Sequence, residues 1–197
     1  MAVKPHQQLM TAAVERDGEG QRALLAGDAG AARAAFRQAA ELYRESWEAA
    51  PPRSYGRLVG MLKSAVLAGD ARREAEYVRA ALGEQQAGDS ATAAYALAIA
   101  ALIDGDDEAA IGWSARMRDG SEAFGRTADA IAAAASRDRA AYSLALGAIV
   151  HDFEQRPNHL TGVPIADTAA MLERLAGARG IESGMSSPVL CSEGSLG

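Results

Sequence analysis

The sequence predicts an all-helical protein made of antiparallel helical hairpins. Hydrophobic residues make up 49% of the 197 residues and aromatic residues only 5%, so most of the apolar content is alanine, leucine, isoleucine and valine. Alanine has the highest intrinsic helix propensity. Recurring glycine-aspartate pairs predict the corners between helices, because glycine ends a helix in the left-handed conformation and aspartate caps the next helix. These pairs are Gly27-Asp28, Gly69-Asp70 and Gly105-Asp106.

The first hairpin is predicted to have an irregular first arm. Residues 7–16 have helical composition, but Gly18 and Gly20 follow closely and are expected to interrupt or strain the helix. Residues 21–26 then form either a short separate arm or a continuation. Beyond the corner near residue 27, apolar residues at spacings of three and four predict a long second helix that ends at Pro51-Pro52.

Three further hairpins are predicted from the same pattern. Their corners lie near residues 69, 105 and 137, and the last corner, Ser136-Arg137-Asp138, lacks glycine. The corners at Gly27, Gly69, Gly105 and Ser136 are 42, 36 and 31 residues apart by subtraction of their positions, which brackets the period of helical-hairpin repeats. Their predicted arms cover residues 58–66 and 75–82, 91–103 and 109–117, and 123–135 and 140–153.

A last helix over residues 164–178 is predicted to follow a loop. Residues 155–162 contain proline, asparagine and glycine, which are typical of loops. Pro164 suits the first turn of a helix, because that position needs no backbone donor. We expect this helix to cover the apolar face of the last hairpin, since a terminal repeat has no further neighbour.

The end of the chain is predicted to lie outside the folded domain. Residues 182–197 are rich in serine and glycine and contain few apolar residues, so we expect a flexible tail. Pro188-Val189-Leu190 is the stretch of the tail apolar enough to dock locally. A single helical-repeat domain is therefore expected over residues 1–181.

The first hairpin resembles the tetratricopeptide repeat family. The unit of that family is a helix, a tight turn often written Gly-Asp, and a second helix with small, aromatic and small positions in turn. Here Gly27-Asp28 is followed by Ala32, Phe36 and Ala39, and Gly20 occupies the small position of the preceding arm. The third and fourth units match in part and the second is displaced by about one residue, so the resemblance covers roughly residues 13–153.

The resemblance implies a right-handed stack of hairpins, a tetratricopeptide-like α-solenoid, closed by a C-terminal capping helix. It also implies that the first arm of each unit lines a concave surface that binds a protein or peptide. Residues 153–189 look similar to uncharacterised bacterial helical proteins, and that second resemblance implies no functional residues.

Composition argues against several classes of partner. The formal net charge is -6 and no stripe of arginine and lysine follows any predicted helix, which disfavours nucleic acid. The most apolar window, residues 91–103, is too short to span a membrane, and residues 1–10 contain no secretory signal. The one cysteine, Cys191, excludes an intrachain disulfide and a cysteine-based metal cage. We therefore expect a cytoplasmic protein without a cofactor.

The densest cluster of polar side chains suggests a metal site as one interpretation. The cluster comprises His151, Asp152, Glu154, His159 and Asp167, and His151, His159 and Asp167 are its candidate ligands for zinc or iron. The chain lacks a His-Glu-x-x-His helix and paired histidines four residues apart. In the simpler interpretation, His151 favours a helix C-terminus, His159 packs in the loop, and Asp167 complements the positive end of the last helix. Because no catalytic motif is present either, we expect that the protein is not an enzyme.

Candidate partner-binding residues follow from the resemblance. Lys63 of the second unit and Thr92, Tyr95 and Ile99 of the third fall on arms that would line the concave surface. Tyrosine is common at binding hot spots because it combines apolar area with a hydroxyl group. The alternative for Tyr95 is burial between hairpins.

Three functions are consistent with the sequence. The first is a non-enzymatic interaction module for a protein or peptide. The second is an immunity-type or regulatory inhibitor of a partner protein. The third is a small metal-dependent enzyme or ligand binder centred on His151 and His159. A homodimer is consistent with each of them, since repeat ends and alanine-rich faces can pair.

Overall fold

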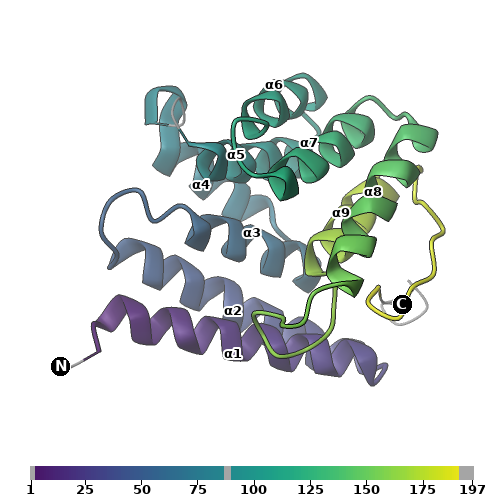
Figure 1. Ribbon diagram of the computed structural model, residues 1–197. Helices are drawn as coiled ribbons and strands as arrows, with labels where there is room; N and C mark the ends of the chain where they lie inside the picture. The colour runs from purple at the N-terminus through teal and green to yellow at the C-terminus, as the bar shows by residue number, and fades with distance from the viewer. Residues whose placement is uncertain (1–2, 87–89, 191–197) are drawn as a thin grey trace.

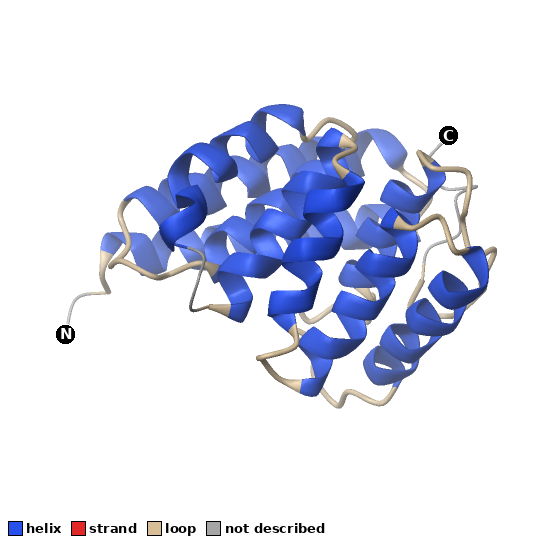
Figure 2. Cartoon of the chain, turned by 90° about the horizontal axis from the view of Figure 1, so that it is seen from above, coloured by secondary structure: helices blue, strands red, loops and turns tan. Residues whose placement is uncertain are grey.

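The computed structural model describes residues 3–86 and 90–190, and this part of the chain is all-helical (Figure 1). Seen from above, it consists of helices joined by loops, with no strand among the described residues (Figure 2). None of these helices is both long and apolar enough to cross a membrane. The nine helices of the described residues are α1 Pro5–Leu25, α2 Ala29–Glu48, α3 Gly56–Ala68, α4 Arg72–Gln86, α5 Ala91–Asp104, α6 Asp107–Met117, α7 Glu122–Ala135, α8 Arg139–Glu154 and α9 Asp167–Gly177.

The turns between helices use local capping chemistry. Gly105 ends α5 with a φ of 77°, a left-handed conformation that glycine adopts without a steric penalty. The Asp106 carboxylate then accepts a hydrogen bond of 3.0 Å from the backbone N–H of Ala109. At the corner without glycine, Arg137 takes the positive φ, 54°, and Asp138 caps α8. The aspartate cap therefore persists where the glycine is missing.

Consecutive helices pack mainly on each other, with one departure. The pairs α1 and α2, α5 and α6, and α7 and α8 are in extensive contact (Figure 1). Helix α4 instead contacts α5 more than α3, and α3 contacts α2, α5 and α9. The second hairpin is therefore more open than its sequence pattern predicted. The largest apolar core cluster includes residues from all nine of these helices.

Of the two alternatives for the first arm, a separate short arm or a continuation, the structure has the continuation. Helix α1 continues through Gly18 and Gly20 to Leu25. A Cβ atom on Gly20 would lie 2.8 Å from the ring of Phe36, which is fully buried in α2. The glycine allows α1 and α2 to approach closely, so tertiary packing outweighs its low helix propensity.

Helix α9 covers more than the last hairpin. It contacts α3 as well as α7 and α8. Arg174 Nη1 donates a 3.1 Å hydrogen bond to the carbonyl oxygen of Leu67 at the end of α3. Just beyond α9, Arg179 donates to the carbonyl oxygen of Leu102 at 2.9 Å and to Asp107 at 2.7 Å. These contacts tie the C-terminal part of the chain to its middle.

The described part of the expected tail is packed against the domain, which corrects the prediction of a flexible segment from residue 182. Val189 and Leu190 are 8% and 6% exposed. The carbonyl oxygen of Val189 accepts a 2.7 Å hydrogen bond from the N–H of Ala166, immediately before α9. Residues 191–197, including Cys191, lie outside the described residues.

Candidate functional site

A pocket of about 230 Å³ lies where helices from both halves of the chain meet. We call it the central pocket. Its wall includes residues of α1, α3, α5, α7, α8, the loop after α8, and the start of α9. Phe124, Ile149 and Phe153 supply apolar surface. The charged residues that line it are Lys63, Arg126, Asp152, Arg156 and Asp167.

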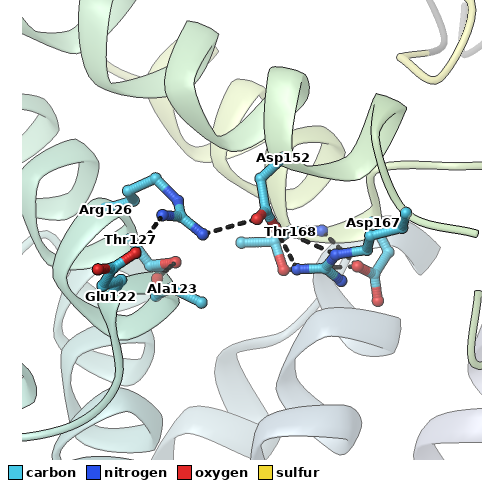
Figure 3. A network of polar contacts seen from close by, with 8 residues as sticks. Glu122, Ala123, Arg126, Thr127, Asp152, Asp167 and Thr168 are labelled. Carbon is cyan, nitrogen blue, oxygen red and sulfur yellow. Dashed lines mark hydrogen bonds and ion pairs between the residues drawn. The ribbon is translucent and has the colours of Figure 1, made fainter.

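Two arginines share one carboxylate on one side of the pocket, and we call this group the arginine cluster. Arg126 of α7 donates from Nη2 to Asp152 Oδ1 of α8 at 2.7 Å (Figure 3). Arg156, just after α8, donates from Nε and Nη2 to Asp152 Oδ2 at 3.1 and 2.5 Å. Its guanidinium also lies 3.8 Å from the ring centroid of Phe153. Among the residues that line the pocket, these two guanidiniums and one carboxylate sum to a formal charge of +1. Arg126 Nη1 also lies 3.8 Å from Glu122 Oε2, but the Glu122 side chain is 97% exposed and outside the lining, so solvent screens this pair.

An ion pair between Lys63 of α3 and Asp167 of α9 lies in another part of the wall. Both side chains are largely buried, at 18% and 26% exposed. Asp167 Oδ1 also accepts a 2.7 Å hydrogen bond from the N–H of Thr168. Burial lowers the pKa of Lys63, but the Asp167 carboxylate, with Tyr95 and Asp17, outweighs burial, so the pKa is raised overall and Lys63 stays charged.

A second carboxylate, Asp17 of α1, lies close enough to interact electrostatically with this ion pair. Ser64 Oγ donates to Asp17 Oδ1 at 2.6 Å, and Tyr43 Oη donates to Oδ2 at 2.8 Å. Burial raises the pKa of Asp17 from 3.8 to about 6, although the hydrogen bonds from Ser64 and Tyr43 oppose this rise. We call Asp17, Lys63 and Asp167 the Lys63 cluster.

Two buried polar atoms in the pocket wall have no hydrogen-bond partner among the described residues. They are Tyr95 Oη and His159 Nδ1. Tyr95 is 8% exposed, and its ring packs edge-on against Phe124 with centroids 5.9 Å apart. Thr168 lies near its hydroxyl group without the geometry of a hydrogen bond. Buried polar groups are almost always hydrogen-bonded, so a group left unpaired in a pocket wall is suited to bond a ligand.

The structure brings together residues that the sequence analysis assigned to competing sites. Lys63 and Tyr95, expected on a partner-binding surface, line the same pocket as His159 and Asp167, expected near a metal. Thr92 is half-buried at the start of α5 and outside the pocket lining.

Two predicted site residues are not available to this pocket. Ile99 is fully buried in the core and has no surface to offer a partner, which corrects its assignment as a partner-binding residue. His151 is 73% exposed, lies 4.0 Å from Glu154, and does not line the pocket. In residues 3–86 and 90–190, no group of three or more histidine, cysteine, aspartate or glutamate side chains is placed to hold a metal ion. The three candidate ligands His151, His159 and Asp167 therefore do not converge.

Sequence reasoning missed Asp17, Arg126 and Arg156, and it noted Asp152 only as a member of the polar cluster around His151. Asp17 follows the buried Ala13 by four positions, so a carboxylate on the apolar face of α1 was a detectable signal. Asp152 and Arg156 are also four residues apart, which favours an ion pair on a helix. No sequence signal relates Arg126 to Asp152, because they lie on different helices and meet only through the packing of α7 on α8.

We find no match to this chain among family models, curated proteins or solved structures. The likeness to tetratricopeptide repeats therefore rests on the residues of this chain alone.

Proposed function

We propose that this protein is a non-enzymatic binding protein whose central pocket takes a small organic anion. One observation carries the proposal: the arginine cluster presents two guanidiniums and one carboxylate to a pocket that also holds the unpaired Tyr95 hydroxyl. The whole chain has a formal charge of -6, so this positive site is not a general property of the molecule.

The chemistry of the wall supports an anion with an apolar part. Guanidinium groups recognise carboxylates and phosphates through paired hydrogen bonds, and Arg126 and Arg156 are held in place by Asp152. Phe124 and Ile149 can cover an apolar portion of the ligand. The volume of about 230 Å³ is below the range of ~300–1,000 Å³ that suits drug-sized ligands, which favours a small molecule.

Binding is favoured over catalysis by the state of the carboxylates. Asp152 and Asp167, which line the pocket, are both engaged by cationic side chains. A general base needs to reach a substrate proton with its own lone pair. Because both carboxylates are already paired with cationic side chains, they are better suited to hold those cations in place than to abstract a proton from a substrate.

Calorimetry with Arg126→Gln tests this proposal. The probes are propionate, hexanoate, benzoate and butyl phosphate, and we expect at least one to bind the unaltered protein. Loss of a charged hydrogen-bond donor should then weaken binding by about tenfold or more. Arg118→Gln is the matched control, because Arg118 pairs with Asp129 at an exposed site outside the central pocket. Failure of every probe to bind, or equal affinity in Arg126→Gln, would contradict the proposal.

An exposed apolar groove on α7 and α8 supports a second candidate function, the binding of a protein or of a second copy of this chain. Leu144 is 80% exposed and borders a groove of about 530 Å³ with Ala132, Ala141 and Ala148 in its wall. Sedimentation of Leu144→Lys tests self-association, with Leu25→Lys on α1 as the control, since Leu25 is 52% exposed. Concentration-dependent association that Leu144→Lys leaves unchanged would count against this surface.

We also propose that α1 to α8 form a right-handed, tetratricopeptide-like stack with α9 as its C-terminal cap. Close glycine-aromatic contacts support it: a Cβ atom would lie 2.8 Å from Phe36 at Gly20 and 2.8 Å from Tyr43 at Gly60. The family places small residues against an aromatic one in this way. An experimental structure with hairpins stacked in the opposite hand would overturn this proposal.

A further inference from the structure

We propose that the ligand of the central pocket is a zwitterion, with its carboxylate or phosphate on the arginine cluster and a protonated amine at the Lys63 cluster. This inference rests on the proposed anion-binding function and adds a second, positively charged group to the ligand. The relevant ligand class is therefore an amino acid or a similarly small amino-phosphate.

The two clusters carry opposite surplus charges. In the arginine cluster, two guanidiniums face one carboxylate of the pocket lining, which leaves +1, because the further partner of Arg126, Glu122, is 97% exposed and screened by solvent. In the Lys63 cluster, two carboxylates, Asp17 and Asp167, face one ammonium, which leaves -1 once both are ionised. In the view of Figure 3, Arg126 lies on one side of Asp152 and Asp167 lies on the other side. The pocket is therefore electrically polarised.

An amine at the Lys63 cluster would find acceptors there. Asp167 lines the pocket with its carboxylate, and the Tyr95 hydroxyl, 8% exposed, has no hydrogen-bond partner among the described residues. Because an ammonium group has three donors and no acceptor, Asp167 and Tyr95 Oη can each take one of its hydrogen bonds. The unpaired hydroxyl is an observation independent of the carboxylates, and its oxygen can accept a hydrogen bond from the ligand.

Simpler ligands match only one of the two clusters. A monocarboxylate neutralises the arginine cluster and leaves the surplus negative charge of Asp17 and Asp167 uncompensated. A simple amine compensates the Lys63 cluster but leaves the positive charge of the arginine cluster uncompensated, and Arg126 and Arg156 repel it. Charges in a partly buried site are weakly screened, so each mismatch lowers affinity more than it would at an exposed site.

Calorimetry with probes matched in chain length tests the inference near neutral pH. The zwitterions are β-alanine, 4-aminobutyrate and 6-aminohexanoate, and their partners without the amine are propionate, butyrate and hexanoate. O-phosphoethanolamine distinguishes phosphate from carboxylate. We expect the best-fitting zwitterion to bind about tenfold or more tightly than its matched anion.

Two variants locate the amine. Asp167→Asn should abolish the preference for the zwitterion without weakening the matched anion, and Tyr95→Phe should reduce the preference while the protein stays folded, because its hydroxyl makes no bond in the protein. Asp129→Asn, in the exposed pair with Arg118, is the control and should leave every affinity unchanged.

The outcomes separate the two proposals. Equal affinity for zwitterion and matched anion, with Arg126→Gln still weakening both, would overturn the zwitterion and leave anion binding in place. A preference that survives both Asp167→Asn and Tyr95→Phe would also overturn it. Absence of binding by every probe would overturn both proposals.

Discussion

Asp17 links the charge of the pocket region to the stability of the fold. Burial raises the pKa of its carboxyl from 3.8 to about 6, so the folded protein holds this proton more tightly than the unfolded chain. The proton therefore stabilises the fold fully below about pH 4, and this stabilisation is lost as the pH rises through about 6. Lys63, whose pKa is raised, keeps its charge throughout this window.

We expect Asp17→Asn to gain stability relative to the unaltered protein as the pH rises. Asparagine does not ionise, so the variant does not lose this stabilisation. The free energy of unfolding of Asp17→Asn minus that of the unaltered protein should therefore rise by up to about 3 kcal/mol between about pH 4 and pH 7. Urea denaturation across this range measures the difference. The control Asp129→Asn, at an exposed site, should give a difference that stays flat. A flat difference for Asp17→Asn as well would show that its carboxyl is not perturbed.

At the scale of the helices, the approach of α1 to α2 depends on an absent side chain. Gly20 lies inside α1, where glycine is the poorest ordinary helix former, and its α-carbon faces the ring of the fully buried Phe36. The sparse contact between α3 and α4 and the continuity of α1 both depend on such contacts between helices. They explain why helix boundaries were easier to predict than helix packing.

Gly20→Ala should destabilise the protein by about 1–2 kcal/mol, because the strain of an added methyl group against Phe36 exceeds the gain in helix propensity. Gly112→Ala is the matched control within α6, where nothing lies within 4 Å of the added Cβ atom. We expect that control to gain up to about 1 kcal/mol. Thermal or urea denaturation of both variants measures the contrast, and two changes of the same sign would refute the close approach.

At the scale of the whole molecule, α9 and the residues after it join parts of the chain that are distant in sequence. Arg174 donates a hydrogen bond to the end of α3, and Arg179 donates hydrogen bonds to the end of α5 and the start of α6. A linear repeat array has contacts only between neighbours and can unfold in parts. Contacts from α9 to α3, α7 and α8 favour unfolding as one unit.

Leu172→Ala in α9 should therefore destabilise the whole chain. Leu172 is fully buried, and its truncation should lower the free energy of unfolding by about 2–5 kcal/mol. Trp47 on α2 and Trp113 on α6 should report the same loss when each is read in a variant that lacks the other. Leu144→Ala, at an exposed position, should change stability by less than ~0.5 kcal/mol. A loss seen by Trp113 alone would indicate independent units.

The sequence by itself determined the helical class and the capped turns. Gly105, Asp106 and Asp138 act through hydrogen bonds and backbone angles within a few residues, so a local pattern is sufficient to predict them. It also marked Lys63, Tyr95, His159 and Asp167 as residues of interest, but on separate grounds and at separate sites.

Only the tertiary structure decided that these residues share one pocket. Lys63 meets Asp167, and Arg126 meets Asp152, because α9 packs on α3 and α8 packs on α7. The tertiary structure likewise decided that α1 is continuous and that Ile99 belongs to the buried core. Capping depends on neighbours along the chain, whereas a pocket depends on which helix faces meet, and that is set by the packing of the whole molecule.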